Sequence, residues 1–146
     1  MNLREQLTNP MHFEENRLPA CSDHTFCHGT EQTPRMLSLD GTWAVQVVPD
    51  LDARTPDFES HHQNTWQTMQ IPGHLNFEGF EPLQYTNTAY PWDGLEQLTP
   101  PQLPEKIPTA QLTRTFVLPA DWMGQPLRLW PGGVEPACRI WISGTY

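Results

Sequence analysis

Large rings and a hydrogen-bonding amide gather in one stretch of the chain, residues 71–93. Three prolines and two glycines interrupt this stretch, so neither a helix nor a regular strand can run through it. The amide of Asn87 lies among the rings and can both donate and accept hydrogen bonds. Flat apolar rings beside such a group suit a ligand with hydroxyls on its edge and C–H groups on its face, as a sugar has. The five rings are Phe77, Phe80, Tyr85, Tyr90 and Trp92.

A plainer interpretation fits the same residues. The stretch can be an ordered loop whose rings fill a core and whose Asn87 caps a turn. Spacing alone favours this second interpretation, because nothing in it requires a ligand.

The string Gln84–Pro91, read as Tyr-Thr-Asn-x-x-Tyr-Pro and preceded by Ile71–His74, resembles the N-terminal sugar-binding domain of family 2 β-galactosidases. The resemblance implies that Asn87 reaches into an active site on a separate barrel domain and binds the galactosyl unit. One departure lies beside it: Leu75 occupies a position where the family usually has Trp.

Other segments carry the same resemblance. Glu14–Ala20 is similar to an Asn-Arg-x-x-Ala string in the family's N-terminal arm, which lies near a subunit contact in bacterial members. Ser38–Trp43 is similar to a Leu-Asn-Gly-x-Trp string that opens the domain. Ile107–Leu112 departs from the family's Asn-Pro-Thr-Gly-x-Tyr, since the Asn, Gly and Tyr are all replaced.

No catalytic residue can be assigned. Hydrolysis with retention needs two carboxyl groups about 5–5.5 Å apart, one as acid/base and one as nucleophile. Glu14 and Glu15 lie in the arm, and Glu78 and Glu81 flank turns, so none has a supporting context. The resemblance implies that the two catalytic Glu lie on a later (β/α)8 barrel, and that the Mg and Na of family enzymes also bind outside this segment. We therefore expect no cofactor in this chain.

One cluster has the residue types of a zinc site: Cys21, His24, Cys27 and His28. Structural zinc sites usually place their ligands on two knuckles separated by a longer loop. The resembling family has no structural metal here, so we expect no metal site. The pair His61-His62 would point to opposite sides of a strand, and we expect a solvated loop there.

Composition excludes several functions. With eight Lys and Arg against 17 Asp and Glu the net charge is −9, which disfavours nucleic-acid binding. No segment approaches the roughly 20 apolar residues that span a membrane. Residues 1–8 lack the apolar run of a secretory signal, and the three Cys are an odd count, so we expect reduced thiols and a cytoplasmic location.

The pattern predicts an all-β jelly-roll β-sandwich, galactose-binding-like, preceded by an extended arm over residues 1–35 and occupying residues 36–146. Sixteen prolines favour short strands joined by turns, which we place at 42–48, 65–71, 113–118, 127–130 and 138–142. The chain ends just past a hairpin turn at Ser143-Gly144, which suggests an incomplete sandwich. The expected core residues are Trp43, Val45, Val47, Trp66, Met69, Phe116, Leu127, Leu129, Ile140 and Trp141.

Two functional hypotheses follow. In the first, the chain is the N-terminal sugar-binding domain or a fragment of a β-galactosidase, whose partners are a galactoside and the remaining domains or subunits. In the second, it is an inactive truncated gene product or a stand-alone carbohydrate-binding module.

Overall fold

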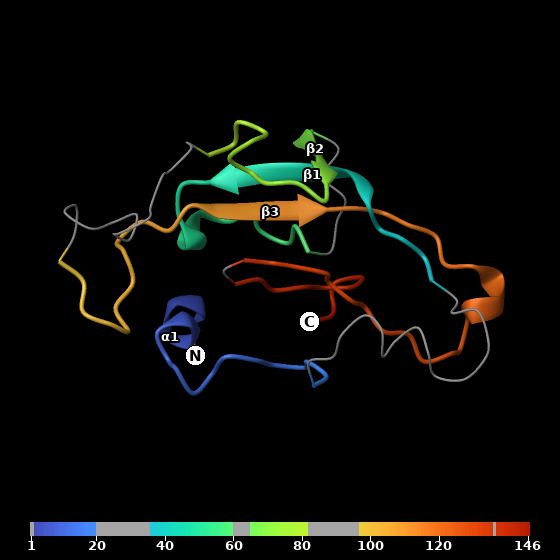
Figure 1. Cartoon of the computed structure of the whole chain (residues 1–146), viewed down its shortest axis with the longest axis horizontal. Coiled ribbons are helices and arrows are strands. Elements are labelled where there is room, and N and C mark those ends of the chain that lie inside the picture. The colour runs from blue at the N-terminus through green and yellow to red at the C-terminus, as the bar shows by residue number, and fades with distance from the viewer. Residues whose placement is uncertain (1, 20–35, 60–64, 82–96, 136) are drawn as a thin grey trace.

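A three-stranded antiparallel sheet organises the chain (Figure 1). The structure, a computed structural model, describes residues 2–19, 36–59, 65–81, 97–135 and 137–146. Its elements in chain order are α1 (Leu3–Leu7), β1 (Gly41–Val48), the 3₁₀ turn η1 (Leu51–Ala53), β2 (Gln67–Ile71), β3 (Thr109–Thr113) and the 3₁₀ turn η2 (Ala120–Trp122). The described residues are thus all-β in character with little helix, as predicted.

The strand β1 lies in the middle of the sheet, in the order β2-β1-β3. Trp43 stands opposite Met69 of β2, and Val45 stands opposite Leu112 of β3. Residues that oppose each other across an antiparallel pair share a face, so these side chains pack together. Val45 and Met69 are the most buried apolar residues there, with 1% and 3% of their surface exposed.

The loop after β1 covers the other face of the sheet. The Thr55 N–H donates to Gln111 Oε1 at 3.1 Å, and the Thr55 hydroxyl donates to Gln46 Oε1 at 2.9 Å. Leu51 is buried beside them. Leu51 and Thr55 therefore close over β1 and β3, while the solvated loop expected at His61 and His62 lies outside the described residues.

A buttressed turn leads into β1. Arg114 Nη1 donates to the carbonyl oxygens of Leu39 and Asp40, each at 2.6 Å, and Trp43 Nε1 donates to Leu39 O at 2.8 Å. Gly41 has φ of 120°, and a Cβ added to it would lie 3.2 Å from Arg114 Nη1. The Asp-Gly-Thr-Trp sequence thus meets a conformational need that only glycine satisfies easily.

The C-terminal segment lies along the sheet on the same side as α1 (Figure 1). Trp141 meets Phe58 edge-on with ring centroids 5.8 Å apart, which ties this segment to the loop after β1. A single antiparallel bridge joins Ile142 to Thr145 around Ser143 and Gly144, both at positive φ. The predicted hairpin turn is present at this position.

Three predicted strands are corrected. The third strand of the sheet is Thr109–Thr113, four residues before the predicted 113–118. Residues 127–130 and 138–142 form no strand apart from the bridge at Ile142. Alternation of apolar residues predicts which segments can pair, but a strand forms only where a partner edge accepts its hydrogen bonds. Among the described residues these segments have no such edge.

The expected core is correct near β1 and wrong after β3. Val45 and Met69 are buried, while Trp43, Val47, Trp66 and Trp141 are partly buried. Four expected core residues are more than a third exposed, because no second described sheet covers them: Phe116, Leu127, Leu129 and Ile140.

The N-terminal arm is not extended throughout. Leu3–Leu7 form a short helix whose start is fixed by a capping box: the Asn2 side chain accepts from the Glu5 N–H, and the Glu5 carboxylate accepts from the Asn2 N–H. Residues 9–19 continue without regular structure. The Asn-x-x-Glu pattern of residues 2–5 is the sequence signal for this helix.

We expect Gly41→Ala to destabilise the fold by about 1–3 kcal/mol, because alanine at positive φ is strained and its methyl group would press on Arg114. Urea denaturation measures the loss. Gly124→Ala is the matched control, since Gly124 also has positive φ (76°) but open space around it. If the two variants unfold at the same urea concentration, the contact between the new methyl group and Arg114 adds nothing to the destabilisation.

Candidate functional site

The predicted sugar contact lies between two segments that the structure describes. Asn87, with Tyr85, Tyr90 and Trp92, falls within residues 82–96 and so lies outside the described residues. Residues 71–81 lead into that stretch from β2, and residues 97–108 lead from it to β3. Asn87 therefore remains a prediction, and the geometry that can be examined is that of the two flanking segments.

The segment after β2 folds into a tight turn. The carbonyl oxygen of His74 accepts from the N–H groups of Phe77 and Glu78, both at 3.1 Å, and Leu75 O accepts from the Phe80 N–H at 2.9 Å. Gly79 ends the turn at φ 81°, a conformation that glycine adopts without strain. Residues 74–80 thus form a hydrogen-bonded unit next to residue 82.

This turn presents an aromatic ring to solvent. Phe77 is 77% exposed, and its ring meets that of His74 edge-on with centroids 5.5 Å apart. The family-typical Trp position holds the partly buried Leu75. An exposed ring held by a neighbour offers an apolar face for the C–H surface of a ligand.

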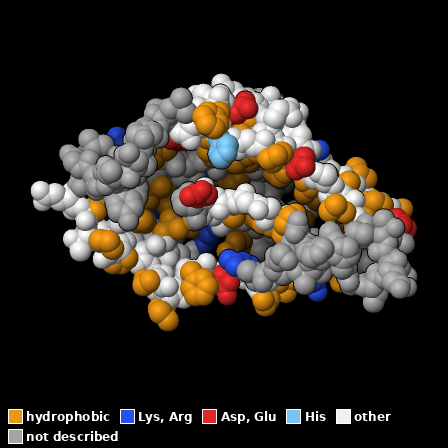
Figure 2. Space-filling model, in the orientation of Figure 1, with side chains coloured by type: hydrophobic (Ala, Val, Ile, Leu, Met, Phe, Trp, Pro, Cys, Tyr) orange, Lys and Arg blue, Asp and Glu red, His pale blue; other side chains and the backbone are white. Residues whose placement is uncertain are grey.

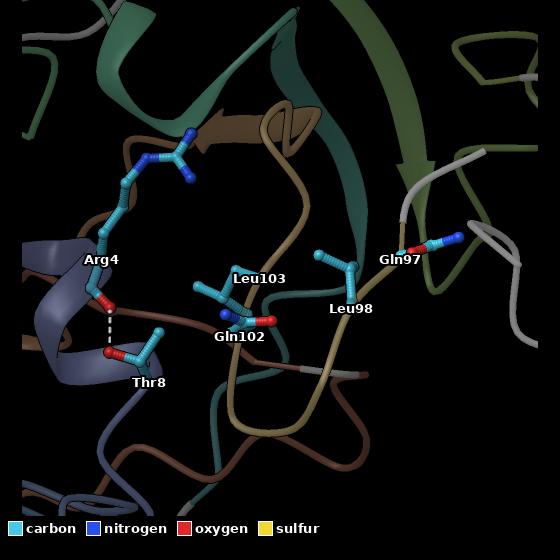
Figure 3. Close-up of a pocket in the computed structure, with 6 residues that line it drawn as sticks. All are labelled: Arg4, Thr8, Gln97, Leu98, Gln102 and Leu103. Carbon is cyan, nitrogen blue, oxygen red and sulfur yellow. Dashed lines mark hydrogen bonds between the residues drawn. The ribbon is translucent and has the colours of Figure 1, made fainter.

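A cleft opens between the arm helix and the segment that follows residue 96 (Figure 3). Its volume is about 430 Å³, and its walls are neutral amides, a hydroxyl, two leucines and the stem of an arginine: Arg4, Thr8, Gln97, Leu98, Gln102 and Leu103. The Thr8 hydroxyl is turned back to donate to the Arg4 carbonyl at 3.1 Å, as the dashed line in Figure 3 shows. Gln102 Oε1 accepts from the Thr99 N–H at 2.8 Å.

The arginine of this cleft holds the arm against the domain. Arg4 pairs with Asp50 at 2.5 Å and with Asp52 at 3.0 Å. It also donates to the carbonyl oxygens of Pro104 at 3.2 Å and Glu105 at 2.7 Å. Four of the five guanidinium N–H groups are therefore used in joining α1 to two segments of the domain.

One carboxylate oxygen is the centre of this contact. Asp50 Oδ1 accepts from Arg4, from the Leu51 N–H at 2.7 Å and from the Ile107 N–H at 3.2 Å. Desolvation alone would raise the pKa of Asp50, but the hydrogen bonds from Ile107, Arg4 and Leu51 outweigh it and hold that pKa below its ordinary value of 3.8. Hydrogen bonds to both aspartates raise the pKa of Arg4, which stays charged.

Sequence reasoning missed both Arg4 and Asp50. The capping box at residues 2–5 could have revealed the helix, but no local pattern links Arg4 to an aspartate 46 positions away. Such a contact follows from how the segments lie in space.

The four acidic residues considered for catalysis lie in two segments, the arm and the turn after β2. Glu15 lies 3.5 Å from His12 and Glu14 lies 3.6 Å from Arg17, both pairs local to the arm. Glu78 and Glu81 lie in and after the turn that follows β2. No group of three metal-binding side chains occurs in the described ranges, while Cys21, His24, Cys27 and His28 lie outside them. None of the helices in the described part of the chain has the length and apolar character that crossing a membrane requires.

The three-stranded sheet, with little helix around it, defines an all-β domain. Residues 36–146 match the model of the sugar-binding domain of the family 2 glycosyl hydrolases, and the chain belongs to this family.

Curated relatives are consistent with this assignment. A "Beta-galactosidase" of Halalkalibacterium halodurans is 34% identical over 92% of the chain, and one of Lactobacillus delbrueckii subsp. bulgaricus is 31% identical over 96%. The "Beta-galactosidase large subunit" of Leuconostoc lactis is 30% identical over 96%. The chain spans 14% of the length of the first two and 25% of the third. No solved structure matches the fold.

We expect acid to weaken the contact between Arg4 and Asp50. Because the folded-state pKa of Asp50 is depressed, its contribution to stability is complete above the ordinary pKa of 3.8 and is lost as the pH falls through the folded value. The melting temperature should therefore fall below about pH 4, and less so in Asp50→Asn. Thermal unfolding from pH 7 to pH 3 measures this, and parallel curves for the two proteins would contradict it.

Proposed function

We propose that this chain is the N-terminal sugar-binding domain of a β-galactosidase, which hydrolyses terminal β-D-galactose residues. In this proposal Asn87 contacts the galactosyl unit in an active site completed by a separate barrel domain. The observation that carries it is the family match over residues 36–146 together with relatives named β-galactosidase, of which the chain spans 14%.

The flanking geometry supports a sugar as the ligand. The turn at 74–80 holds the exposed ring of Phe77 close in sequence to the Tyr-Thr-Asn string. Rings of this kind stack on the C–H face of a sugar, while an amide satisfies its hydroxyls. Asn87 supplies that amide in the proposal.

An apolar surface supports the proposal that further domains cover this one. Figure 2 shows hydrophobic side chains exposed in several separate places on one face of the molecule. Several large apolar residues after β3 are exposed to 38% or more, which isolated soluble domains seldom leave uncovered in such number: Phe116, Val117, Leu127, Leu129, Trp130, Val134 and Ile140. We propose that a second sheet of a jelly-roll sandwich and the other domains of a β-galactosidase bury these residues, and that the protein acts in the cytoplasm.

A second candidate is a stand-alone carbohydrate-binding module or an inactive truncated product. The replacements at Leu75 and Ile107–Leu112 favour it, because they remove side chains that the family usually keeps. Whether the DNA immediately downstream encodes a barrel with two catalytic Glu separates the two candidates.

The isolated chain should not hydrolyse a chromogenic galactoside. Retaining chemistry requires a close pair of carboxyl groups that act as acid/base and nucleophile, and no acidic residue of this chain has a sequence context that supports either role. Release of nitrophenol by the purified chain, constant through further purification, would contradict this expectation.

Replacing Asn87 by Ala in the assembled enzyme should lower kcat/KM by roughly several-fold to a hundredfold. A lost neutral hydrogen bond costs about 0.5–1.5 kcal/mol, and more where the bond tightens in the transition state. Steady-state kinetics and thermal unfolding are measured on the same variant.

The kinetics and the thermal unfolding of the Asn87→Ala variant together decide the role of Asn87. A sugar contact predicts lower kcat/KM with an unchanged melting temperature. Unchanged kcat/KM beside a clearly lower melting temperature would show that Asn87 only caps its own loop.

A further inference from the structure

The arm and the domain meet through charged groups drawn from three distant parts of the sequence. Arg4 comes from α1, Asp50 from the N-cap of η1 just after β1, and Pro104 and Glu105 from the segment that leads to β3. In Figure 3 the Arg4 side chain extends from α1 past the cleft, away from Leu98 and Leu103. The guanidinium of Arg4 thus joins α1 to both of the other segments.

Asp50 couples the arm to the local structure of the domain. Its Oδ1 holds the N–H of Leu51, the first residue of η1, and the N–H of Ile107, two residues before β3. The same oxygen accepts from Arg4. When the arm docks, the Arg4 guanidinium therefore binds a carboxylate that also holds the first residue of η1 and the segment just before β3.

We propose that Arg4 and Asp50 form a latch that makes α1 a structural part of the domain and fixes residues 104–107 in front of β3. When the latch is closed, α1 forms one wall of the cleft at residues 97–103. When it opens, α1 separates from that segment, and η1 and residues 104–107 lose a shared anchor. The latch is a conformational device that stands independently of the proposed function.

Asp50 and Asp52 contribute unequally to the stability of this latch. Asp52 is 70% exposed and binds only Arg4 in the ion pair, so water screens it. The Asp50 side chain is 27% exposed and is shared with two backbone N–H groups. A guanidinium is required on the arm, because the planar fork reaches two carboxylates and two carbonyls, whereas a lysine ammonium is a single point.

Hydrogen exchange of the whole chain, followed by NMR at pH 7, tests the latch. In Arg4→Ala the amides of Leu51 and Ile107 should exchange at least about tenfold faster, because a charge-assisted contact has been removed. The Phe80 amide, bonded within its own turn, should be unchanged. Arg17→Ala is the matched control, since that arm arginine only pairs with Glu14.

Further variants define the partner of Arg4. Arg4→Lys should restore protection only in part, Asp52→Asn should have little effect, and Asp50→Asn should accelerate the Ile107 amide as Arg4→Ala does. The double variant of Arg4→Ala and Asp50→Asn should be no worse than the more affected single variant, because both remove one contact.

Unchanged exchange at Leu51 and Ile107 in Arg4→Ala would overturn the latch. Faster exchange at Phe80 to the same extent would also overturn it, because the effect would then be global unfolding. Additive effects in the double variant would show that Arg4 and Asp50 act separately, which contradicts the proposal.

Discussion

The antiparallel pairing of β1 with strands on both of its sides is the constraint on which the described structure depends. It joins segments about 25 and 65 residues apart and places Val45 between Gln67 of β2 and Leu112 of β3. Val45 is almost wholly buried, and full burial of such a side chain stabilises a fold by about 1.5–3 kcal/mol. The loops on both faces take their places from this sheet.

Two arginines connect the ends of the sheet to the rest of the chain. Arg114, directly after β3, holds the Leu39 and Asp40 carbonyls where β1 begins. Arg4 holds Asp50 where β1 has ended. Each guanidinium donates hydrogen bonds to several carbonyl or carboxylate oxygens in turns. Its planar group of N–H donors can reach several such acceptors at once. The strand is therefore fixed at both ends by groups remote in sequence.

The exposed apolar residues after β3 complement this picture. A three-stranded sheet has two edges and can bury only part of the apolar surface that this chain carries. The apolar residues at 127–130 and 138–142 alternate as strand residues do, yet among the described residues they form no strand apart from the bridge at Ile142. The chain belongs to a family in which the Halalkalibacterium halodurans relative is much longer, since the chain spans 14% of it.

The sequence by itself determined the family, the all-β character, the positions of β1 and β2 and the hairpin turn at Ser143-Gly144. These follow from local rules: alternation of Trp43, Val45 and Val47, glycine where φ is positive, and a long unusual string around Asn87. Only the tertiary structure decided that β3 begins at Thr109, that Phe116 and Leu127 are exposed, and that Arg4 reaches Asp50. Strand pairing and ion pairs between distant segments depend on which groups meet in space, and no local pattern encodes that meeting.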